Sequence, residues 1–478
     1  MSYIIDYTVT VAAFVLAVVS AGHALLSKRD PKASLGWMGL CLLIPFGGPF
    51  LYFLFGVNRV RTRAIKLRGH APDADESMRE QNTYVAASYG VPAESLPAHA
   101  DLLNISDTIT NTPLVGGNRI DVLHNGEQAY PAMLAAIESA RSSICLTTYI
   151  FETNETGRCF IDALGRAVTR GVDVRVIIDG VGELYSCPRA GNLLKKRRVR
   201  VARFLPPKLL PPSLHINLRN HRKILIVDGV DGFTGGMNIG DRHLAERTEN
   251  PNRVMDIHFR LSGPIVGQIE SVFFEDWHFL TGSYEKKETQ RCREEGSAIC
   301  RVITEGPNED IDKLSIVLVG AVSSARSSVT IMTPYFIPPR GLLAVLQAAA
   351  LKGVEVTVLL PEKNNLALVH WATRNLLWEL LERGVRIYYQ PGPFVHSKLF
   401  IVDNHYVHIG SANIDPRSLR LNFELAVEVY DRTLASLLAA YVEEVKDRSR
   451  PLLLQEVDGR PLPEKLRDAV AWLLSPYL

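Results

Sequence analysis

The chain has 478 residues, of which 47% are hydrophobic and 22% charged, and its net charge is +2. This length exceeds the size at which one core keeps growing, so two or three folded units are expected, and the composition excludes a mainly disordered chain. Proteins that bind long nucleic acids by releasing counterions usually carry a larger basic excess. The small charge therefore counts against that class unless the basic residues are segregated.

The first sixty residues contain two apolar stretches. Ile4 to Leu26 is long enough to cross a bilayer, and residues 35–55 form a second stretch that the sequence PFGGP interrupts at 45–49. A polar turn at 27–32 separates them, so we expect a transmembrane helical hairpin over residues 1–60. Residues 1–19 lack Lys and Arg, which argues against a cleaved signal peptide, whereas a buried helical pair is a weaker alternative. The Pro/Gly break leaves open whether the second stretch spans or re-enters.

The basic residues around this hairpin indicate its orientation. Three lie in the turn at 27–32, and five lie between Arg59 and Arg68. Because basic residues prefer the cytoplasmic side, five against three favours a cytoplasmic catalytic region.

Beyond a polar linker over residues 61–115, the chain alternates between helix and strand patterns, and it does so twice. In each copy a helix end runs into an apolar strand, and a later helix stops at glycine before a Val/Ile-rich strand. The matched segments are 136–144 with 321–329, 148–151 with 333–336, and 170–178 with 352–360. A period this long indicates a duplicated domain, so we expect two α/β domains at 116–295 and 296–478.

The six cysteines give no sign of a metal or redox site. They lie at 41, 145, 159, 187, 292 and 300 without a Cys-x-x-Cys pair, and no histidine cluster has zinc-like spacing. We expect free thiols without a catalytic role, although Cys292 and Cys300 could pair, and we expect no metal and no cofactor.

A further matched pair of motifs carries the chemistry. Residues 220–228 read NHRKILIVD and are followed by GGMN at 235–238, whereas residues 395–403 read VHSKLFIVD and are followed by GSAN at 410–413. The alternative, that each histidine is only a core residue at a strand start, would need two coincidences in register with a duplicated domain.

The spacing within each motif assigns its side chains to faces. Apolar residues after each lysine mark a strand, so His221 and Lys223 share one face, and the second copy places its His and Lys in the same way. Asp228 completes the first motif, but it falls on the opposite face at the strand end and is better explained as a turn or scaffold residue. Glycines in the following segment let the backbone approach closely and bring Asn238 towards the site. The corresponding residues of the second half are His396, Lys398, Asp403 and Asn413.

These motifs resemble the paired HKD motifs of the phospholipase D superfamily, and their context is most similar to bacterial cardiolipin synthases. The likeness covers nearly the whole chain and includes KRDPK and PFGGP near the N-terminus, LRNHRK at 218–223, TPYFIPP at 333–339, SANIDPRS at 411–418 and LNFE at 421–424. Two departures are Gly236, where the superfamily often has serine, and VMD at 254–256, where the family usually has Trp-Arg-Asp. The second departure weakens the transfer of neighbouring substrate contacts.

The resemblance implies two halves packed about a pseudo-twofold axis with one active site on it. It implies that His221 is the nucleophile and that His396 is the general acid and then the base, although the near-symmetry of the motifs leaves this order open. The two lysines and two asparagines would hold the phosphate oxygens in place of a metal. Each histidine also needs a carboxylate to fix its tautomer. We expect Glu424 to serve His396 and Asp256 to serve His221.

The implied reaction converts two phosphatidylglycerol molecules into cardiolipin and glycerol through a phosphohistidine. The implied partners are this phospholipid and the bilayer, with no nucleic acid, and the implied location is the bacterial inner membrane as a multi-pass protein. The alternative is a phosphodiesterase of the same type that hydrolyses phospholipid or nucleic acid. A non-catalytic membrane scaffold is disfavoured because His, Lys and Asn are intact in both halves. The basic and proline-rich stretch at 195–212 suits contact with an anionic bilayer or, equally, a solvated helix end followed by a rigid loop. No oligomeric state is indicated.

Overall fold

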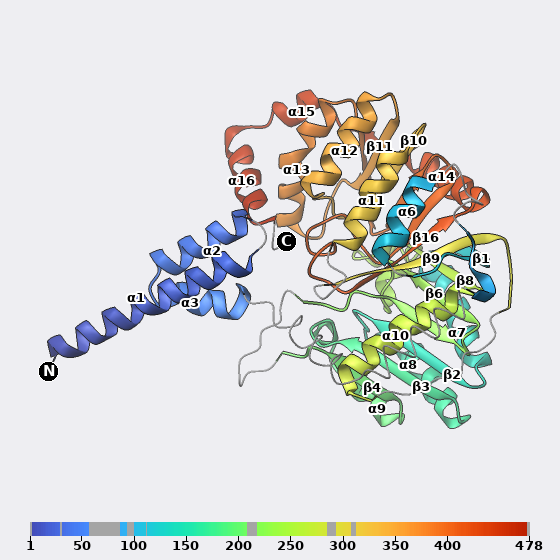
Figure 1. Ribbon diagram of the computed structural model, residues 1–478. Coiled ribbons are helices and arrows are strands. Elements are labelled where there is room, and N and C mark those ends of the chain that lie inside the picture. The colour runs from blue at the N-terminus through green and yellow to red at the C-terminus, as the bar shows by residue number, and fades with distance from the viewer. Residues whose placement is uncertain are drawn as a thin grey trace.

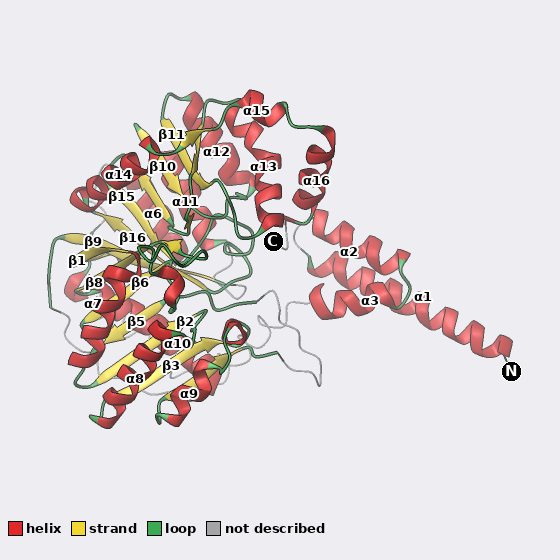
Figure 2. Ribbon diagram, turned by 180° about the vertical axis from the view of Figure 1, so that it is seen from behind, coloured by secondary structure: helices red, strands yellow, loops and turns green. Residues whose placement is uncertain are grey.

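The two copies of the repeat fold into two similar halves, shown in the computed structural model of Figures 1 and 2. The structure describes residues 2–28, 31–56, 87–92, 100–110, 112–207, 218–283, 293–306 and 312–475. The first half contains β1 (Val115–His124), α7 (Asn125–Ser139), β2 (Ser143–Thr148), α8 (Glu155–Thr169), β3 (Asp173–Asp179), the 3-10 helix η4 (Gly182–Tyr185), α9 (Ala190–Lys196), β4 (Arg200–Phe204), β5 (Ile224–Val227), β6 (Asp231–Gly235), the 3-10 helix η5 (Asp241–His243), β7 (Val254–Met255), β8 (Ile257–Ser262) and α10 (Ile265–Thr281).

The second half repeats this order with additions at its end. It contains β9 (Ala298–Glu305), α11 (Lys313–Ser324), β10 (Ser328–Met332), α12 (Arg340–Leu351), β11 (Glu355–Pro361), α13 (Ala367–Leu381), β12 (Arg386–Gln390), β13 (Phe394–Val395), β14 (Leu399–Val402), β15 (Tyr406–Gly410), β16 (Glu424–Tyr430), α14 (Arg432–Asp447), β17 (Arg450–Pro451), α15 (Leu454–Asp458) and α16 (Leu462–Leu473). The helix-to-strand transitions predicted at 136–144 and 321–329 are confirmed.

The strands join into one sheet whose order is β17-β12-β11-β10-β14-β15-β16-β9-β1-β8-β6-β5-β2-β3-β4. Outward from the antiparallel pair β1–β9, equivalent strands of the two halves follow in the same order. In each half the three strands β2–β4 or β10–β12 run parallel, as βαβ connections require, and the inner strands are antiparallel. The predicted α/β class with a duplicated unit is confirmed.

The apolar core continues across the seam between the halves. One cluster contains Phe259 and Ile269 from the first half together with Val302, Leu425 and Leu438 from the second. Each fully buried side chain of this size contributes about 1.5–3 kcal/mol. Two further clusters lie under the outer helices, one in each half. The shared core therefore fixes the two halves against each other, which a site built from both halves needs.

The N-terminal helices project from this body (Figures 1 and 2). They are α1 (Ser2–Ser27), α2 (Pro31–Leu43), α3 (Gly47–Leu51) and the π-helix η1 (Tyr52–Gly56). Ala24 of α1 packs with Trp37, Cys41 and Tyr52 in a small separate cluster. Among the described residues, only α1 has the length and apolar composition to cross a membrane.

The second span of the predicted hairpin is therefore not shown. Pro45 lacks a backbone N–H and disfavours helical backbone in the residue before it, so α2 ends at Leu43. A side chain at Gly48 would collide with the carbonyl oxygen of Leu40, which shows how tightly the chain turns back there. The stretch at 35–55 thus forms short helical pieces rather than one long helix.

Two other predictions fall near the described boundaries. Much of the predicted linker at 61–115 lies outside the described residues, but α6 (Ala100–Thr110) packs on α11, and its Ser106 Oγ donates to Glu428 Oε2 at 3.1 Å. Cys41, Cys145, Cys159, Cys187 and Cys300 are free thiols, as predicted, whereas Cys292 lies outside the described residues.

Candidate active site

Each motif histidine lies on a segment that pairs with the opposite half of the molecule. The His221 N–H donates to the Phe423 carbonyl at 2.9 Å, and the His396 N–H donates to the Met255 carbonyl at 2.8 Å. A short parallel pair, β13 with β7, continues the second of these contacts. The two backbone crossings are equivalent, and they bring both motifs to the seam between the halves.

The crossings decide which carboxylate serves which histidine. His221 Nδ1 lies 3.0 Å from either Glu424 carboxylate oxygen, and His396 Nδ1 lies 2.8 Å from Asp256 Oδ2. The partners predicted from the sequence are therefore exchanged: Glu424 serves the first histidine and Asp256 serves the second. The reason is the backbone pairing, because Phe423 and Met255 directly precede the two carboxylates.

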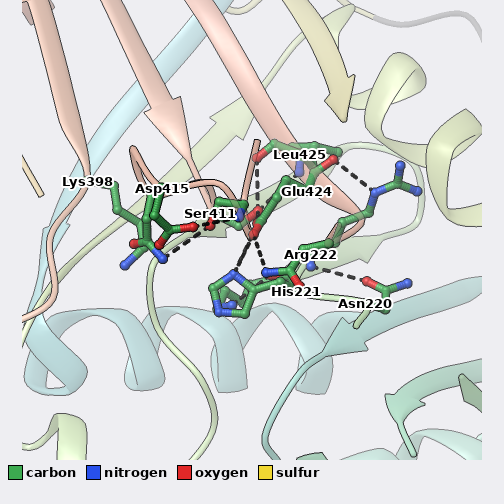
Figure 3. Close-up of polar contacts among 12 residues, drawn as sticks. Asn220, His221, Arg222, Lys398, Ser411, Asp415, Glu424 and Leu425 are labelled. Carbon is green, nitrogen blue, oxygen red and sulfur yellow. Dashed lines mark hydrogen bonds and ion pairs between the residues drawn. The ribbon is translucent and has the colours of Figure 1, made fainter. Parts of the chain in front are cut away.

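The Glu424 carboxylate is fully buried and held by further donors (Figure 3). Ser411 Oγ donates to Oε2 at 2.5 Å, and Asn422 Nδ2 donates to Oε1 at 3.1 Å. Burial alone would raise the pKa of Glu424, but its contacts with His221 and its other neighbours outweigh burial and lower the pKa. An ionised carboxylate at Nδ1 fixes the tautomer that leaves the lone pair on Nε2.

Gly236 is explained by the other carboxylate. It directly follows β6, as Ser411 directly follows β15 in the second half. A Cβ at Gly236 would lie within 2.5 Å of the Asp256 carboxylate. The Ile257 N–H donates to Asp256 Oδ1 at 2.8 Å. The shorter Asp256 thus lies against the backbone of Gly236, whereas the longer Glu424 accepts a hydrogen bond from the Ser411 hydroxyl. A serine side chain at position 236 would collide with Asp256, which explains the glycine.

The two motif lysines are buried beside the histidines. Lys223 Nζ donates to the His221 carbonyl at 2.7 Å, and Lys398 Nζ donates to the His396 carbonyl at 2.5 Å. The intervening Arg222 points to the other side, where it binds Asp276 of α10 at 2.7 Å, as strand alternation predicts. Burial lowers the pKa of Lys223 to about 7 and that of Lys398 to about 8, against the opposing pull of the nearby carboxylates.

Burial also lowers the pKa of both histidines. For His221, the charge of Lys223 lowers the pKa further while Glu424 raises it; for His396, Lys398, Lys223 and His221 all lower it. These mutual effects mean that groups of both halves act on one another within one site. These effects favour the neutral form of both rings, whereas an anionic substrate would raise the pKa of the histidines and lysines alike.

The two asparagines lie close by and are buried. Asn238 Oδ1 accepts from the Ile150 N–H at 3.2 Å, and Asn413 Nδ2 donates to Ser418 Oγ at 3.3 Å. Asn413 Oδ1 has no hydrogen-bond partner among the described residues. With Lys398, Asn413 lines a cavity of about 20 Å³.

The motif aspartates bind the backbone at the start of the neighbouring strands. Asp228 accepts hydrogen bonds from the backbone N–H groups of residues 141–143 at 2.7–2.9 Å, and Asp403 does the same for residues 326–328. Burial would raise the pKa of each, but these backbone donors outweigh it and lower the pKa. Asp228 directly follows β5 and Asp403 directly follows β14, whereas the histidines lie before these strands, which agrees with the scaffold interpretation.

Sequence reasoning missed several residues around the histidines. The Tyr149 ring lies edge-on to His221 with centroids 5.3 Å apart, and the Tyr335 ring lies 6.3 Å from that of His396. Both tyrosines occur in the repeated segments 148–151 and 333–336, at the second position of the first and the third position of the other, so a tyrosine in each copy was a usable signal. His243 Nε2 accepts from the Asn238 N–H at 3.2 Å, and its ring lies 6.4 Å from that of His396. No spacing pattern pointed to His243.

A larger cavity of about 210 Å³ lies elsewhere in the second half and contains none of the motif residues. Its arginines are paired with carboxylates: Arg374 with Glu464 at 2.8 Å, Arg450 with Glu456 at 2.6 Å, and Arg460 with Asp468. One histidine, His370, lines this cavity, but none of the buried lysines found at the seam does.

Comparisons with known proteins show the family to which the chain is related. The family model described as "Cardiolipin synthase, PLD-like domain" matches residues 133–277 and 318–446, and "Phospholipase_D-nuclease N-terminal" matches 15–56. The major cardiolipin synthase of Bacillus subtilis is 32% identical, covering 94% of this chain and 95% of its own. Cardiolipin synthase A of Pseudomonas putida (strain F1) is 31% identical, covering 97% and 96%.

Among solved structures, a phosphatidylserine synthase of Haemophilus influenzae has a TM-score of 0.62 at 16% identity and covers 79% of this chain and 100% of its own, which supports the fold alone. The family match covers both halves of the sheet, and the relatives match along nearly their whole length. The chain therefore belongs to the cardiolipin synthase family of the phospholipase D superfamily, with two phospholipase D-like domains.

Proposed function

We propose that the protein is a cardiolipin synthase that transfers a phosphatidyl group from one phosphatidylglycerol to another, giving cardiolipin and glycerol. The observation that carries this proposal is the paired site at the seam. It contains two histidines, each backed by a carboxylate across the seam, and two buried lysines. The full-length relatives named as cardiolipin synthases support the choice of substrate.

The first step forms a covalent intermediate. His221 Nε2 attacks phosphorus, the bond from phosphorus to the glycerol oxygen breaks, and His396 gives its proton to the departing alkoxide. The order rests on the family's usual assignment. It also agrees with the contacts of Glu424, the carboxylate that binds His221 Nδ1. His221, Ser411 and Asn422 all contact this carboxylate.

The second step reverses the roles. The hydroxyl of a second phosphatidylglycerol gives its proton to His396 and attacks the phosphohistidine, so the bond from phosphorus to His221 breaks and cardiolipin leaves. One phosphodiester replaces another, so the exchange is close to neutral in free energy. The site must therefore favour a lipid alcohol over water by positioning and exclusion of water.

The lysines and asparagines stabilise the charge that develops on the phosphate oxygens. Lys223 and Lys398 lie two residues after the histidines, directly before β5 and β14, and Asn238 and Asn413 follow the next strand of each half. Fixed donors in a site that excludes water stabilise this charge without reorganisation. The anion in turn holds the lysines in their charged form, which burial alone disfavours.

We further propose that residues 1–60 anchor the enzyme in the bacterial inner membrane as a multi-pass segment, with α1 crossing the bilayer and the second apolar stretch spanning or re-entering. The apolar length of α1 and the family match over residues 15–56 support this. The catalytic domains at 116–295 and 296–478, which follow the linker at 61–115, lie on the cytoplasmic side, where five basic residues follow the segment.

The test uses the full-length protein in phosphatidylglycerol vesicles with a chelator present, followed by separation of the lipids. We expect cardiolipin and free glycerol in equal amounts, and neither product with the His221→Ala or His396→Ala variant. Phosphatidic acid as the main product would instead establish hydrolysis. A requirement for added metal would contradict the mechanism, and cleavage of DNA offered beside the lipid would establish a nuclease.

A further inference from the structure

The C-terminal helix α16 has its charged and apolar sides in the reverse of the usual arrangement. A helix on the surface of a soluble protein packs its apolar side on the body and exposes its charged side. In α16 four apolar side chains are exposed instead, and their spacing of three or four residues places them on one side of the helix. They are Leu462 (69% exposed), Leu466 (59%), Val470 (59%) and Leu473 (68%). We refer to these four residues as the apolar stripe.

The opposite side of α16 is fixed against α13 by ion pairs. Asp468 is fully buried and pairs with Arg460, with Arg467 at 2.8 Å and with Arg374 at 3.4 Å. Glu464 pairs with the same Arg374 at 2.8 Å. Rotating the helix to bury the stripe would expose these pairs and break them. The outward direction of the stripe is therefore part of the fold.

Charge and position identify what covers the stripe. Lys465, which is exposed, and Arg467, which is partly exposed, flank it on its two edges. Basic residues beside an apolar stripe are typical of helices that lie in the interface of an anionic bilayer. In Figures 1 and 2, α16 lies at the edge of the catalytic body nearest α2, on the side from which α1 projects. α16 thus lies on the side of the catalytic body from which the apolar N-terminal helices project.

We propose that α16 lies along the surface of the membrane that holds α1, with its apolar stripe in contact with the acyl chains and Lys465 at the headgroups. The proposal rests on the membrane anchoring in the proposed function and adds a second point of contact far away in the sequence. Two contacts restrict rotation of the catalytic body about α1. They hold the seam at a fixed height above the lipid that it consumes.

The test measures contact between α16 and lipid directly. In the full-length chain, Cys159, Cys187 and Cys292 are replaced by serine, and a fluorophore is attached to a Val470→Cys variant. The matched control carries the fluorophore at Val230→Cys, which is 55% exposed in the turn between β5 and β6. Both proteins are reconstituted into vesicles of phosphatidylglycerol and phosphatidylcholine with brominated acyl chains. We expect bromine to quench the label at position 470 several-fold more strongly than the label at 230.

Equal quenching at the two positions would overturn the proposal. A second outcome would also overturn it: no quenching at position 470, together with a dimer that the Leu466→Glu variant converts into a monomer in sedimentation. The stripe would then be an interface between two copies of the chain. Quenching is measured without turnover. A lack of quenching would therefore contradict only the contact of α16 with lipid and not the proposed synthesis of cardiolipin. Conversely, quenching in a protein that makes no cardiolipin would refute the proposed reaction alone.

A second measurement links the contact to activity. The Leu466→Glu, Val470→Glu double variant should be several-fold slower on phosphatidylglycerol in vesicles and unchanged on a short-chain phosphatidylglycerol dispersed as monomers. The Val230→Glu variant should match the unchanged protein on both substrates. Equal rates of the double variant and the unchanged protein on vesicles, or equal losses on both substrates, would contradict the role of the stripe.

Discussion

The exchanged carboxylates allow the two chemical steps to be separated by substitution. In a Glu424→Gln variant, one carboxylate oxygen becomes an amide nitrogen, yet His221 and Asn422 both offer donors to this group. If the amide nitrogen faces His221, the ring must change tautomer and lose the Nε2 lone pair. If it faces Asn422, two donors oppose each other in a buried site. Losing a hydrogen bond to a charged group costs about 1.5–3 kcal/mol, which corresponds to a rate loss of about 10- to 150-fold.

The assay is rapid quench of the phosphatidyl-enzyme into denaturing detergent at mildly alkaline pH, because acid cleaves the phosphorus–nitrogen bond, with a donor whose leaving group needs no protonation. With such a donor, only attack by His221 limits the first step. Glu424→Gln should then slow formation of the intermediate by the amount given above. Asp256→Asn should form the intermediate at nearly the normal rate and fail to pass it to an alcohol, because His396 can no longer act as a base. The opposite pattern would refute the assignment of His221 as nucleophile, and equal slowing in both variants would refute the separation of roles.

Three other substitutions or conditions follow from the same geometry. Gly236→Ser should displace Asp256 and reduce turnover by about 10- to 100-fold in a protein with an unchanged melting temperature, measured by lipid product and calorimetry. Asp228→Asn should instead lower stability by about 1–2 kcal/mol at pH 7 without changing the turnover of folded protein. The pKa of Asp228 is lowered by folding, so this stabilisation is present above the unfolded value of about 4 and disappears as the pH falls through the folded value. Thermal unfolding at pH 7 and pH 3 should therefore show the gap between the two proteins closing in acid. Finally, burial lowers the pKa of Lys223 to about 7, so kcat/KM should fall above pH 7 as the lysine loses its charge. A pH profile of initial rates that is flat from 7 to 9 would contradict this.

The sequence was sufficient for features that depend on local spacing. The His-x-Lys pattern before an apolar run predicted two side chains on one strand face, and the structure places Arg222 on the other side as this requires. The scaffold interpretation of Asp228 agrees with its backbone contacts for the same reason, since a residue at the far end of a short strand lies away from the residue at its start. The helix-to-strand transitions at 136–144 and 321–329 followed from periodicity.

What the sequence could not supply is contact across the seam. Distance along the chain suggested that each histidine would take a carboxylate from its own half, and Glu424 and Asp256 were assigned accordingly. The actual partners are set by backbone pairs between His221 and Phe423 and between His396 and Met255. Such pairs join residues from different domains, and no local pattern of hydrophobicity encodes them. Tyr149 and His243 were missed for a related reason, because their role depends on neighbours that are distant in sequence.

The exchange also explains why a duplicated protein needs both of its halves for one reaction. If each histidine drew its carboxylate from its own half, each half would contain a complete histidine–carboxylate pair, and the seam would only hold two such pairs together. In the observed arrangement neither half has an oriented histidine without the other. The carboxylates then became unlike: Glu424 is held by a serine hydroxyl, whereas Asp256 lies against a glycine. Two unlike carboxylates give their histidines different environments, which a nucleophile and a general acid acting on one phosphorus atom require.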